Sequence, residues 1–112
     1  MRYLLDTHSF LWWVTDDQNF SSGPRDLFSD RRYGLYLSSA SGWEISLKAA
    51  LGRLKISGDL EKLIPEKMSL NAIEGLPVQM PHALRVFSLP GHHRDLFDRI
   101  LVAQAQLEEM PV

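Results

Sequence analysis

The chain has 112 residues, of which 45% are hydrophobic and 23% charged, and its formal net charge is −2. This length and composition suit one compact domain with one core, and we expect that domain to span residues 1–112. The charge balance excludes a strongly basic nucleic-acid-binding protein, so any such contact must come from local basic positions. The absence of cysteine excludes disulfides and thiolate metal sites.

The sequence also bears on location. No apolar run approaches the roughly 20 residues that cross a bilayer, so we expect no membrane span. The chain opens directly with a strand-like segment, which predicts that no secretory signal is present. Together with the absence of cysteine, these features favour a cytoplasmic location.

Residues 2–7, R-Y-L-L-D-T, predict a first strand. Its apolar run, Tyr3 to Leu5, does not alternate with polar residues, which is typical of a strand covered on both faces. The run ends at Asp6. If the strand is central and parallel, Asp6 lies at the sheet edge where open α/β proteins bind ligands. Asp6 can equally be a simple cap of the following helix, and both interpretations stay open at this point.

Strand-like and helix-like segments alternate through the rest of the chain, which predicts an α/β fold with a parallel sheet. Proline and glycine positions mark several of the boundaries. The expected helices cover residues 9–14, 24–32, the segment from the serine cluster 38–41 to Gly52, 58–71 with an interruption near Pro65, 81–87 and 95–109; the further strands cover 33–38 and 76–80.

Two of these helices have clear start signals. A serine of the cluster 38–41 is a good N-cap for the helix that follows. Asp95 and Asp98 stand in the cap and third-position relation at the start of the last helix. Apolar residues at helical spacing follow each start: Trp43, Leu47, Ala50 and Leu51 in the first helix, and Leu96, Ile100, Ala103 and Leu107 in the second.

Three acids then share one context: Asp6 ends the first strand, while Glu44 and Asp98 lie near the starts of the two capped helices. If the strands are parallel neighbours, the three carboxylates reach the same edge of the sheet. Clustered carboxylates repel one another unless a cation lies among them. Hard oxygen ligands suit Mg²⁺ or Mn²⁺. Such an ion activates water and neutralises the leaving oxygen in phosphodiester hydrolysis.

Simpler explanations exist for two of these acids. Glu44 and Lys48 form an i,i+4 pair that stabilises a helix by about 0.2–0.5 kcal/mol and can be no more than that. Asp98, beside Asp95, can serve only the helix cap and dipole. From the residues alone, these explanations stay open beside a metal site.

Three blocks carry a family resemblance: L-L-D-T-H at 4–8 followed by L-W-W at 11–13; S-S-A-S-G-W-E-I-S-L-K at 38–48 with L-G-R-L at 51–54; and L-P-G-H-H-R-D-L-F-D-R-I-L-V-A-Q-A at 89–105. In this order and spacing the sequence resembles a PIN domain and, more narrowly, a VapC-type toxin of a bacterial toxin–antitoxin pair. The resemblance implies a parallel sheet sandwiched between helices and a metal-dependent endoribonuclease activity.

The resemblance also assigns the acids. Asp6 matches the first-strand acid of the family, and Glu44 matches the acid of its W-E-I motif. Asp98, rather than Asp95, matches the acid that opens the D-R-I-L-V-A-Q-A segment. By this resemblance Asp6, Glu44 and Asp98 are the catalytic residues and the ligands of Mg²⁺ or Mn²⁺.

Supporting residues and partners follow from the same resemblance. Thr7 resembles the small hydroxyl residue beside the first acid and can hydrogen-bond it. Lys48 and Arg99 can contact RNA phosphate or balance the acids. The implied partners are an RNA substrate, a second copy in a homodimer, and an antitoxin that covers the acids. We expect the antitoxin near Trp12, Trp13 and the helices that follow each strand.

The sequence departs from the family pattern at its end. The pattern continues with another strand, often carrying a fourth acid, and a closing helix, whereas this chain ends at Val112. Glu108 and Glu109 are poor substitutes, because they lie in the last turn of a helix whose start holds the site. We therefore expect a sheet that lacks its last strand and helix.

This departure keeps two functions open: a ribonuclease toxin, or a catalytically impaired domain that binds RNA or an antitoxin. A phosphatase that uses Asp6 as nucleophile is disfavoured. Such enzymes usually carry a second acid two residues later, where this chain has His8.

Overall fold

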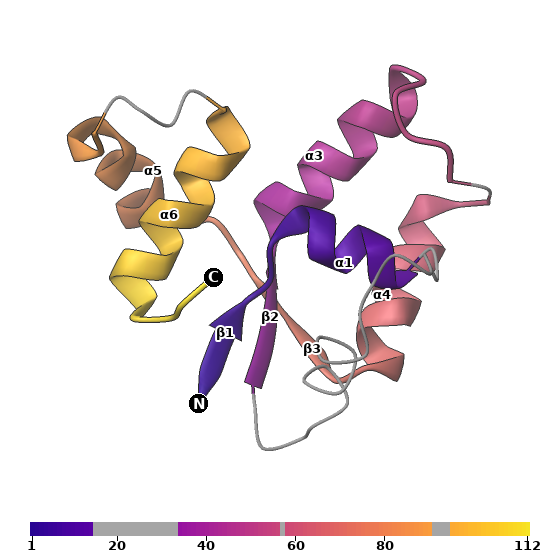
Figure 1. Cartoon of the computed structure of the whole chain (residues 1–112), viewed down its shortest axis with the longest axis horizontal. Helices are drawn as coiled ribbons and strands as arrows, with labels where there is room; N and C mark the ends of the chain where they lie inside the picture. Colours follow the sequence, from indigo (N-terminus) through magenta and orange to yellow (C-terminus); the bar gives the residue numbers. More distant parts are fainter. Residues whose placement is uncertain (15–33, 57, 91–94) are drawn as a thin grey trace.

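The computed structural model describes residues 1–14, 34–56, 58–90 and 95–112. Three parallel strands, β1 (Arg2–Leu4), β2 (Gly34–Ser38) and β3 (Ile73–Leu76), form one sheet in the order β1-β2-β3, with helices on both sides (Figure 1). The predicted α/β fold with a parallel sheet between helices is confirmed. The predicted helix over 24–32 lies outside the described residues.

One edge of the sheet meets the end of the chain. On its inner side β1 pairs with β2, and the Leu5 N–H continues the ladder by donating to the Tyr36 carbonyl at 2.8 Å. On its outer side the Leu4 N–H donates to the Pro111 carbonyl, also at 2.8 Å. Residues after the last helix therefore lie against the outer edge of β1.

Two apolar clusters cover the two faces of the sheet. On one face Leu35 and Leu37 pack with Phe10 of helix α1 (Thr7–Val14), which begins two residues earlier than predicted. On the other face Leu4 packs with Leu101 of the C-terminal helix α6 (Leu96–Glu108). Burial on both faces explains why β1 and β2 have apolar residues in sequence without strict alternation. Helices α3 (Ser39–Ala50) and α4 (Leu60–Leu70) complete the first face (Figure 1).

Both predicted helix starts are confirmed. Ser38 is the N-cap of α3, and its hydroxyl accepts a hydrogen bond from the Ala40 N–H at 3.0 Å. Asp95 is the N-cap of α6, and one carboxylate oxygen accepts from the N–H groups of Phe97 and Asp98 at 2.8 and 3.3 Å. These caps fix where each helix begins, because they satisfy backbone donors that have no partner within the helix.

The predicted end of α3 is also confirmed. Gly52 follows the C-cap with a positive φ of 75°, which costs little in a residue without Cβ. The Arg53 N–H then donates to the Lys48 carbonyl at 2.9 Å, and the Gly52 N–H to the Ala49 carbonyl at 3.1 Å. This pair of bonds is the Schellman arrangement that closes many helices.

The prediction for the third strand was wrong in position. It placed the strand at 76–80, whereas β3 covers Ile73–Leu76. Pro77 has no N–H to donate to a ladder, so it ends the strand instead of lying within it. The next N–H, of Val78, donates to the Ser39 hydroxyl at 3.1 Å. The strand begins earlier because Ile73 is buried in the core, paired with Leu35 of β2.

The predicted interruption of a helix near Pro65 was also wrong. Helix α4 runs through Pro65 without a break, starting after Asp59, whose carboxylate accepts from the Glu61 N–H at 3.0 Å. A proline inside a helix costs about 3 kcal/mol through a lost hydrogen bond and a steric clash. The packing of one side of α4 against the core outweighs that cost; the residues involved are Leu60, Ile64 and Met68.

A short helix, α5 (Met80–Arg85), and a 3₁₀ turn, η1 (Val86–Ser88), lie between β3 and α6 in the chain. They correspond to the helix predicted over 81–87. Helix α5 packs beside α6, away from α1 and α4 (Figure 1). The described helices do not include one with the length and apolar character that a membrane span needs.

Candidate active site

Glu44 is a charged residue on the inner side of α3. The residue is 4% exposed, and its carboxylate oxygen Oε2 lies 2.6 Å from the Lys48 ammonium, one turn later on the same helix. The hydrogen bond to Glu44 is the largest influence that raises the pKa of Lys48; desolvation opposes it, and charge attraction from Glu44, Asp95 and Asp98 adds to it. The i,i+4 pair anticipated from the sequence is therefore present, with its acid buried rather than on the surface.

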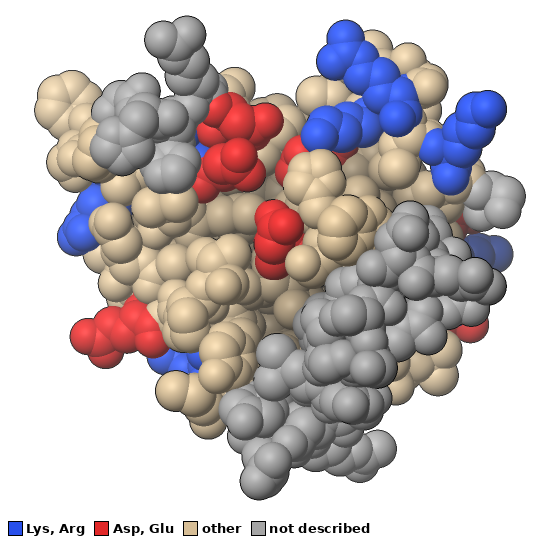
Figure 2. Space-filling view, in the orientation of Figure 1, with Lys and Arg blue, Asp and Glu red and all other residues tan. Residues whose placement is uncertain are grey.

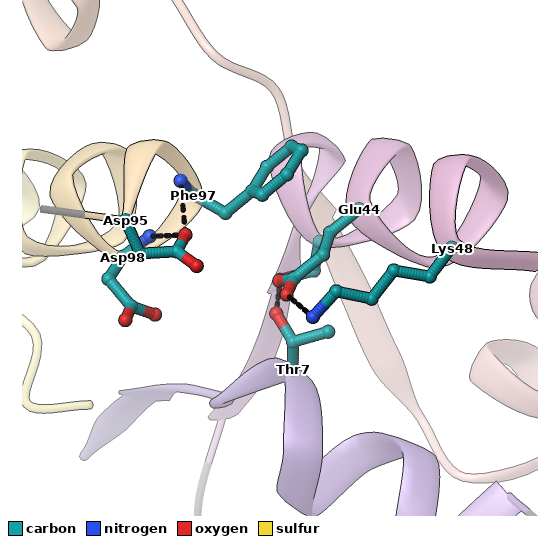
Figure 3. A network of polar contacts seen from close by, with 7 residues as sticks. Thr7, Glu44, Lys48, Asp95, Phe97 and Asp98 are labelled. Carbon is teal, nitrogen blue, oxygen red and sulfur yellow. Dashed lines mark hydrogen bonds and ion pairs between the residues drawn. The ribbon is translucent and has the colours of Figure 1, made fainter. Parts of the chain in front are cut away.

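A buried hydroxyl pair lies next to Glu44. The Thr7 hydroxyl and the Ser41 hydroxyl are 2.7 Å apart and join the start of α1 to the first turn of α3 (Figure 3). Ser41 precedes Glu44 by three residues, so both lie on the same face of the helix. The pair ties the segment that follows Asp6 to the helix that carries Glu44.

Ser41 is a residue that the sequence did not single out. It was a candidate cap, and Thr7 was expected to bond the neighbouring acid. The contact joins residues 34 positions apart, and no local pattern signals it. The one available sign was the spacing of Ser41 and Glu44 on one helical face.

Asp98 lies across from Glu44, in the first turn of α6, and it is exposed. Partial desolvation raises its pKa most, followed by the negative charges of Asp95, Glu44 and Asp6, while His8 lowers it. Acids from the end of β1, from α3 and from α6 therefore act on one carboxyl group. This mutual influence needs the three elements to converge, because solvent screening weakens the interaction of distant charges.

The acids do not form a closed group. Figure 3 shows the Glu44 carboxylate paired with Lys48 and separated from the carboxylates of Asp95 and Asp98 on α6. Within residues 1–14, 34–56, 58–90 and 95–112, no three His, Asp or Glu side chains are arranged to hold a metal ion together. The donors fit a hard divalent cation in their chemistry, and the acids would have to come closer together to hold one.

Arg99, one residue after Asp98, has a structural role. Its guanidinium donates to the carbonyls of Val86 at 3.0 Å, Pro90 at 3.1 Å and Leu89 at 3.5 Å. It thereby fastens the segment before α6 to that helix. Its predicted contact with RNA phosphate stays a prediction, and these bonds favour the structural role.

An aromatic contact joins the helices of Glu44 and Asp98, and basic side chains lie beyond the end of α3. Trp43 of α3 and Phe97 of α6 meet edge to face, with ring centroids 5.0 Å apart and planes at 80°, and they link the two helices beside the acids. On this face of the molecule acidic side chains gather at the start of α6 and basic ones beyond the end of α3 (Figure 2). Arg53 and Lys55 are exposed in the segment after α3.

Comparison with known families decides the identity of the fold. The family model described as the PIN domain matches residues 3–112. This chain belongs to the PIN domain family. PIN domains are a nuclease family whose members generally depend on a metal ion, in keeping with the resemblance found in the sequence. No curated protein matches this PIN domain.

Proposed function

We propose that this PIN domain is a Mg²⁺-dependent endoribonuclease and the VapC-type toxin of a toxin–antitoxin pair. The observation that supports this most is the match to the PIN domain, a nuclease family, over residues 3–112. Asp95 and Asp98 stand together at the start of α6, and after desolvation the charges of Asp95, Glu44 and Asp6 raise the pKa of Asp98. A divalent cation would relieve their repulsion, because it favours the charged form of each acid.

The roles of the residues follow from their places. Asp6, Glu44 and Asp98 would hold the ion, which when bound supplies a polarised water and neutralises the leaving oxygen of the phosphodiester. Mn²⁺ can replace Mg²⁺ with such oxygen ligands. The Thr7–Ser41 hydrogen bond positions Asp6 relative to Glu44 by joining their two elements. Lys48 and the exposed basic residues after α3 would contact RNA phosphates.

The proposed partners are an antitoxin that covers the acids and a second copy of the chain in a homodimer, in the cytoplasm. One side of α3 supports a protein partner beside the site. Trp43, Leu47 and Leu51 recur at intervals of four residues and are 60%, 41% and 59% exposed. Trp12 on α1 is 46% exposed. Exposed apolar residues that adjoin one another commonly mark an interaction surface.

RNA cleavage by matched variants tests the proposal. We expect the wild type to cut single-stranded RNA with Mg²⁺ and not with EDTA. Asp6→Asn should abolish the metal-dependent cleavage and relieve growth arrest on expression. Glu66→Gln neutralises an exposed acid on α4 in the same way, and this variant should keep both the metal-dependent cleavage and the growth arrest. Equal cleavage by wild type and Asp6→Asn would reject the assignment and indicate a contaminating nuclease.

A second candidate is a catalytically impaired PIN domain that binds RNA or an antitoxin. The 2.6 Å ion pair between Glu44 and Lys48 favours it, since this pair engages one of the three acids. Calorimetric titration with Mn²⁺ separates the two candidates. Binding in the low-millimolar range or tighter, lost in Asp6→Asn, supports the enzyme. No binding supports the impaired domain.

A further inference from the structure

The contact between Glu44 and Lys48 has a consequence for metal binding. The Glu44 side chain is 5% exposed and its Oε2 atom lies 2.6 Å from Lys48 Nζ, whereas the Lys48 side chain is 34% exposed. A carboxylate so deeply buried needs a positive charge beside it, because desolvation disfavours its charged form. Lys48 supplies that charge from within the same helix.

We propose that Lys48 is a built-in competitor of the divalent cation: it occupies the Oε2 atom of Glu44, and the ion binds with full affinity only when the Glu44–Lys48 ion pair opens. This inference rests on the proposed function, since it concerns the same site. It assigns Lys48 a positioning role that precedes any contact with RNA.

The geometry supports an exchange between two cations. Figure 3 shows Lys48 and Asp98 on different sides of the Glu44 carboxylate, so the ammonium and an ion bound by both acids would compete for the charge of Glu44. The partly exposed Lys48 can move its ammonium into solvent while its alkyl chain stays on the helix. The Glu44 carboxylate would then be without its internal counter-charge and could bind an ion together with the acids of α6.

Lys48 remains a cation while it does this. A lysine side chain is charged at neutral pH with or without Glu44 beside it. In the closed pair its ammonium balances the carboxylate that would otherwise bind the metal ion. A site whose binding-competent form is only a fraction of the population has its apparent affinity reduced by that fraction.

An ordinary i,i+4 pair predicts something different. Such a pair stabilises the helix slightly and has no effect on a ligand that binds elsewhere. Loss of a basic residue that helps to bind the ion indirectly, by ordering Glu44, would weaken metal binding. Tighter metal binding after the removal of Lys48 would therefore contradict both of these alternatives.

Calorimetric titration of Mn²⁺ into the full chain tests this. Lys48→Met should bind Mn²⁺ about three- to tenfold more tightly than the wild type, if the pair is closed in most molecules. Lys48→Gln should behave as Lys48→Met does and covers the case in which the first variant folds poorly. Lys48→Arg, which can keep the ion pair, should stay near the wild type. Lys62→Met, an exposed lysine on α4, is the matched control and should leave the affinity unchanged.

Thermal unfolding gives a second readout that is independent of cleavage. In EDTA, Lys48→Met should melt below the wild type, because Glu44 loses its counter-charge. Saturating Mn²⁺ should raise its melting temperature by more than it raises that of the wild type, since a tighter ligand stabilises more at equal concentration.

The outcomes separate the two proposals. If the wild type binds Mn²⁺ and Lys48→Met and Lys48→Gln bind it equally or more weakly, Lys48 is not a competitor, and the proposed function stands. If neither the wild type nor any variant binds Mn²⁺, the metal-dependent function fails, and the inference about Lys48 fails with it.

Discussion

Helices α3 and α6 both begin at capped residues beside the site, yet they hold their acids in different ways. Glu44 of α3 is 4% exposed and has the Lys48 ammonium at 2.6 Å. Asp98 of α6 is exposed, and its pKa is raised by desolvation and by the acids around it. One acid is buried with a cation, and the other is open to solvent among like charges.

The difference indicates where positive charge is needed. On the α3 side an internal ammonium already balances the carboxylate, so a metal ion must compete for it. On the α6 side the acids raise the pKa of Asp98 and would gain most from a cation. We therefore expect α6 to provide the first attraction for a divalent ion and Glu44 to join later.

The largest expected effect distinguishes the two acids at the start of α6. Asp98→Asn should reduce Mg²⁺-dependent RNA cleavage by about 100-fold or more, because it removes a proposed metal ligand. Asp95→Asn should keep cleavage within about tenfold, since asparagine caps a helix as well as aspartate does. Single-turnover cleavage of one RNA by both variants measures this. An equal loss in Asp95→Asn would move the ligand role from Asp98 to both acids.

The next effect concerns the hydrogen bond that joins α3 to α1. Ser41→Ala should lower the free energy of unfolding by about 1–3 kcal/mol, because it leaves the buried Thr7 hydroxyl without its 2.7 Å partner. Urea denaturation measures the loss. Ser69→Ala, at an exposed position of α4, is the control. A double variant, Thr7→Val with Ser41→Ala, should cost less than the sum of the single changes. Additive costs would mean that the two hydroxyls act independently.

Local sequence signals predicted the strand and the helix starts next to which the candidate acids lie. The apolar run before Asp6 predicted β1, and the serine cluster and Asp95 predicted the starts of α3 and α6. Each signal involves residues within a few positions of one another, which is the range over which caps and periodicity act. The family resemblance supplied the choice of acids.

The predictions that were wrong or missing concern features that depend on packing between residues far apart in the sequence. The burial of Ile73 beside Leu35 set the position of β3, and core packing carried α4 through Pro65. The contact of Thr7 with Ser41 and the burial of Glu44 likewise come from the meeting of α1 with α3. Helical spacing marked Trp43, Leu47 and Leu51 as one side of α3, but the structure buries the side that carries Glu44.

A smaller effect concerns the N-cap of α6 and compares two substitutions of Asp95. Asp95→Ala should lower the free energy of unfolding by about 0.5–2 kcal/mol, because two N–H groups at the start of α6 lose their acceptor. Asp95→Asn should stay within a few tenths of a kcal/mol of the wild type in the same denaturation series. If the asparagine variant lost as much as the alanine variant, the charge of Asp95 and not its cap would be the stabilising feature.

The smallest effect is the pH dependence of stability that follows from the raised pKa of Asp98. It is measured in EDTA, so that no divalent ion contributes. A carboxyl group whose pKa is higher in the folded than in the unfolded protein destabilises the fold when ionised, and this penalty disappears as the pH falls through the raised pKa toward 3.8. Asp98→Asn has no such penalty at any pH. The stability of the wild type relative to Asp98→Asn should therefore rise between pH 7 and pH 4.

For an exposed group, solvent screening limits this change to a few tenths of a kcal/mol. Melting temperatures of the two proteins across that pH range measure it. The helix-dipole interaction acts on the ionised form of Asp98 and is already part of its net pKa shift, so it does not change the expected sign. A relative stability of the wild type that falls with acidification would mean that Asp98 is stabilised by positive charge. The contrast with Glu44 and its ammonium would then disappear.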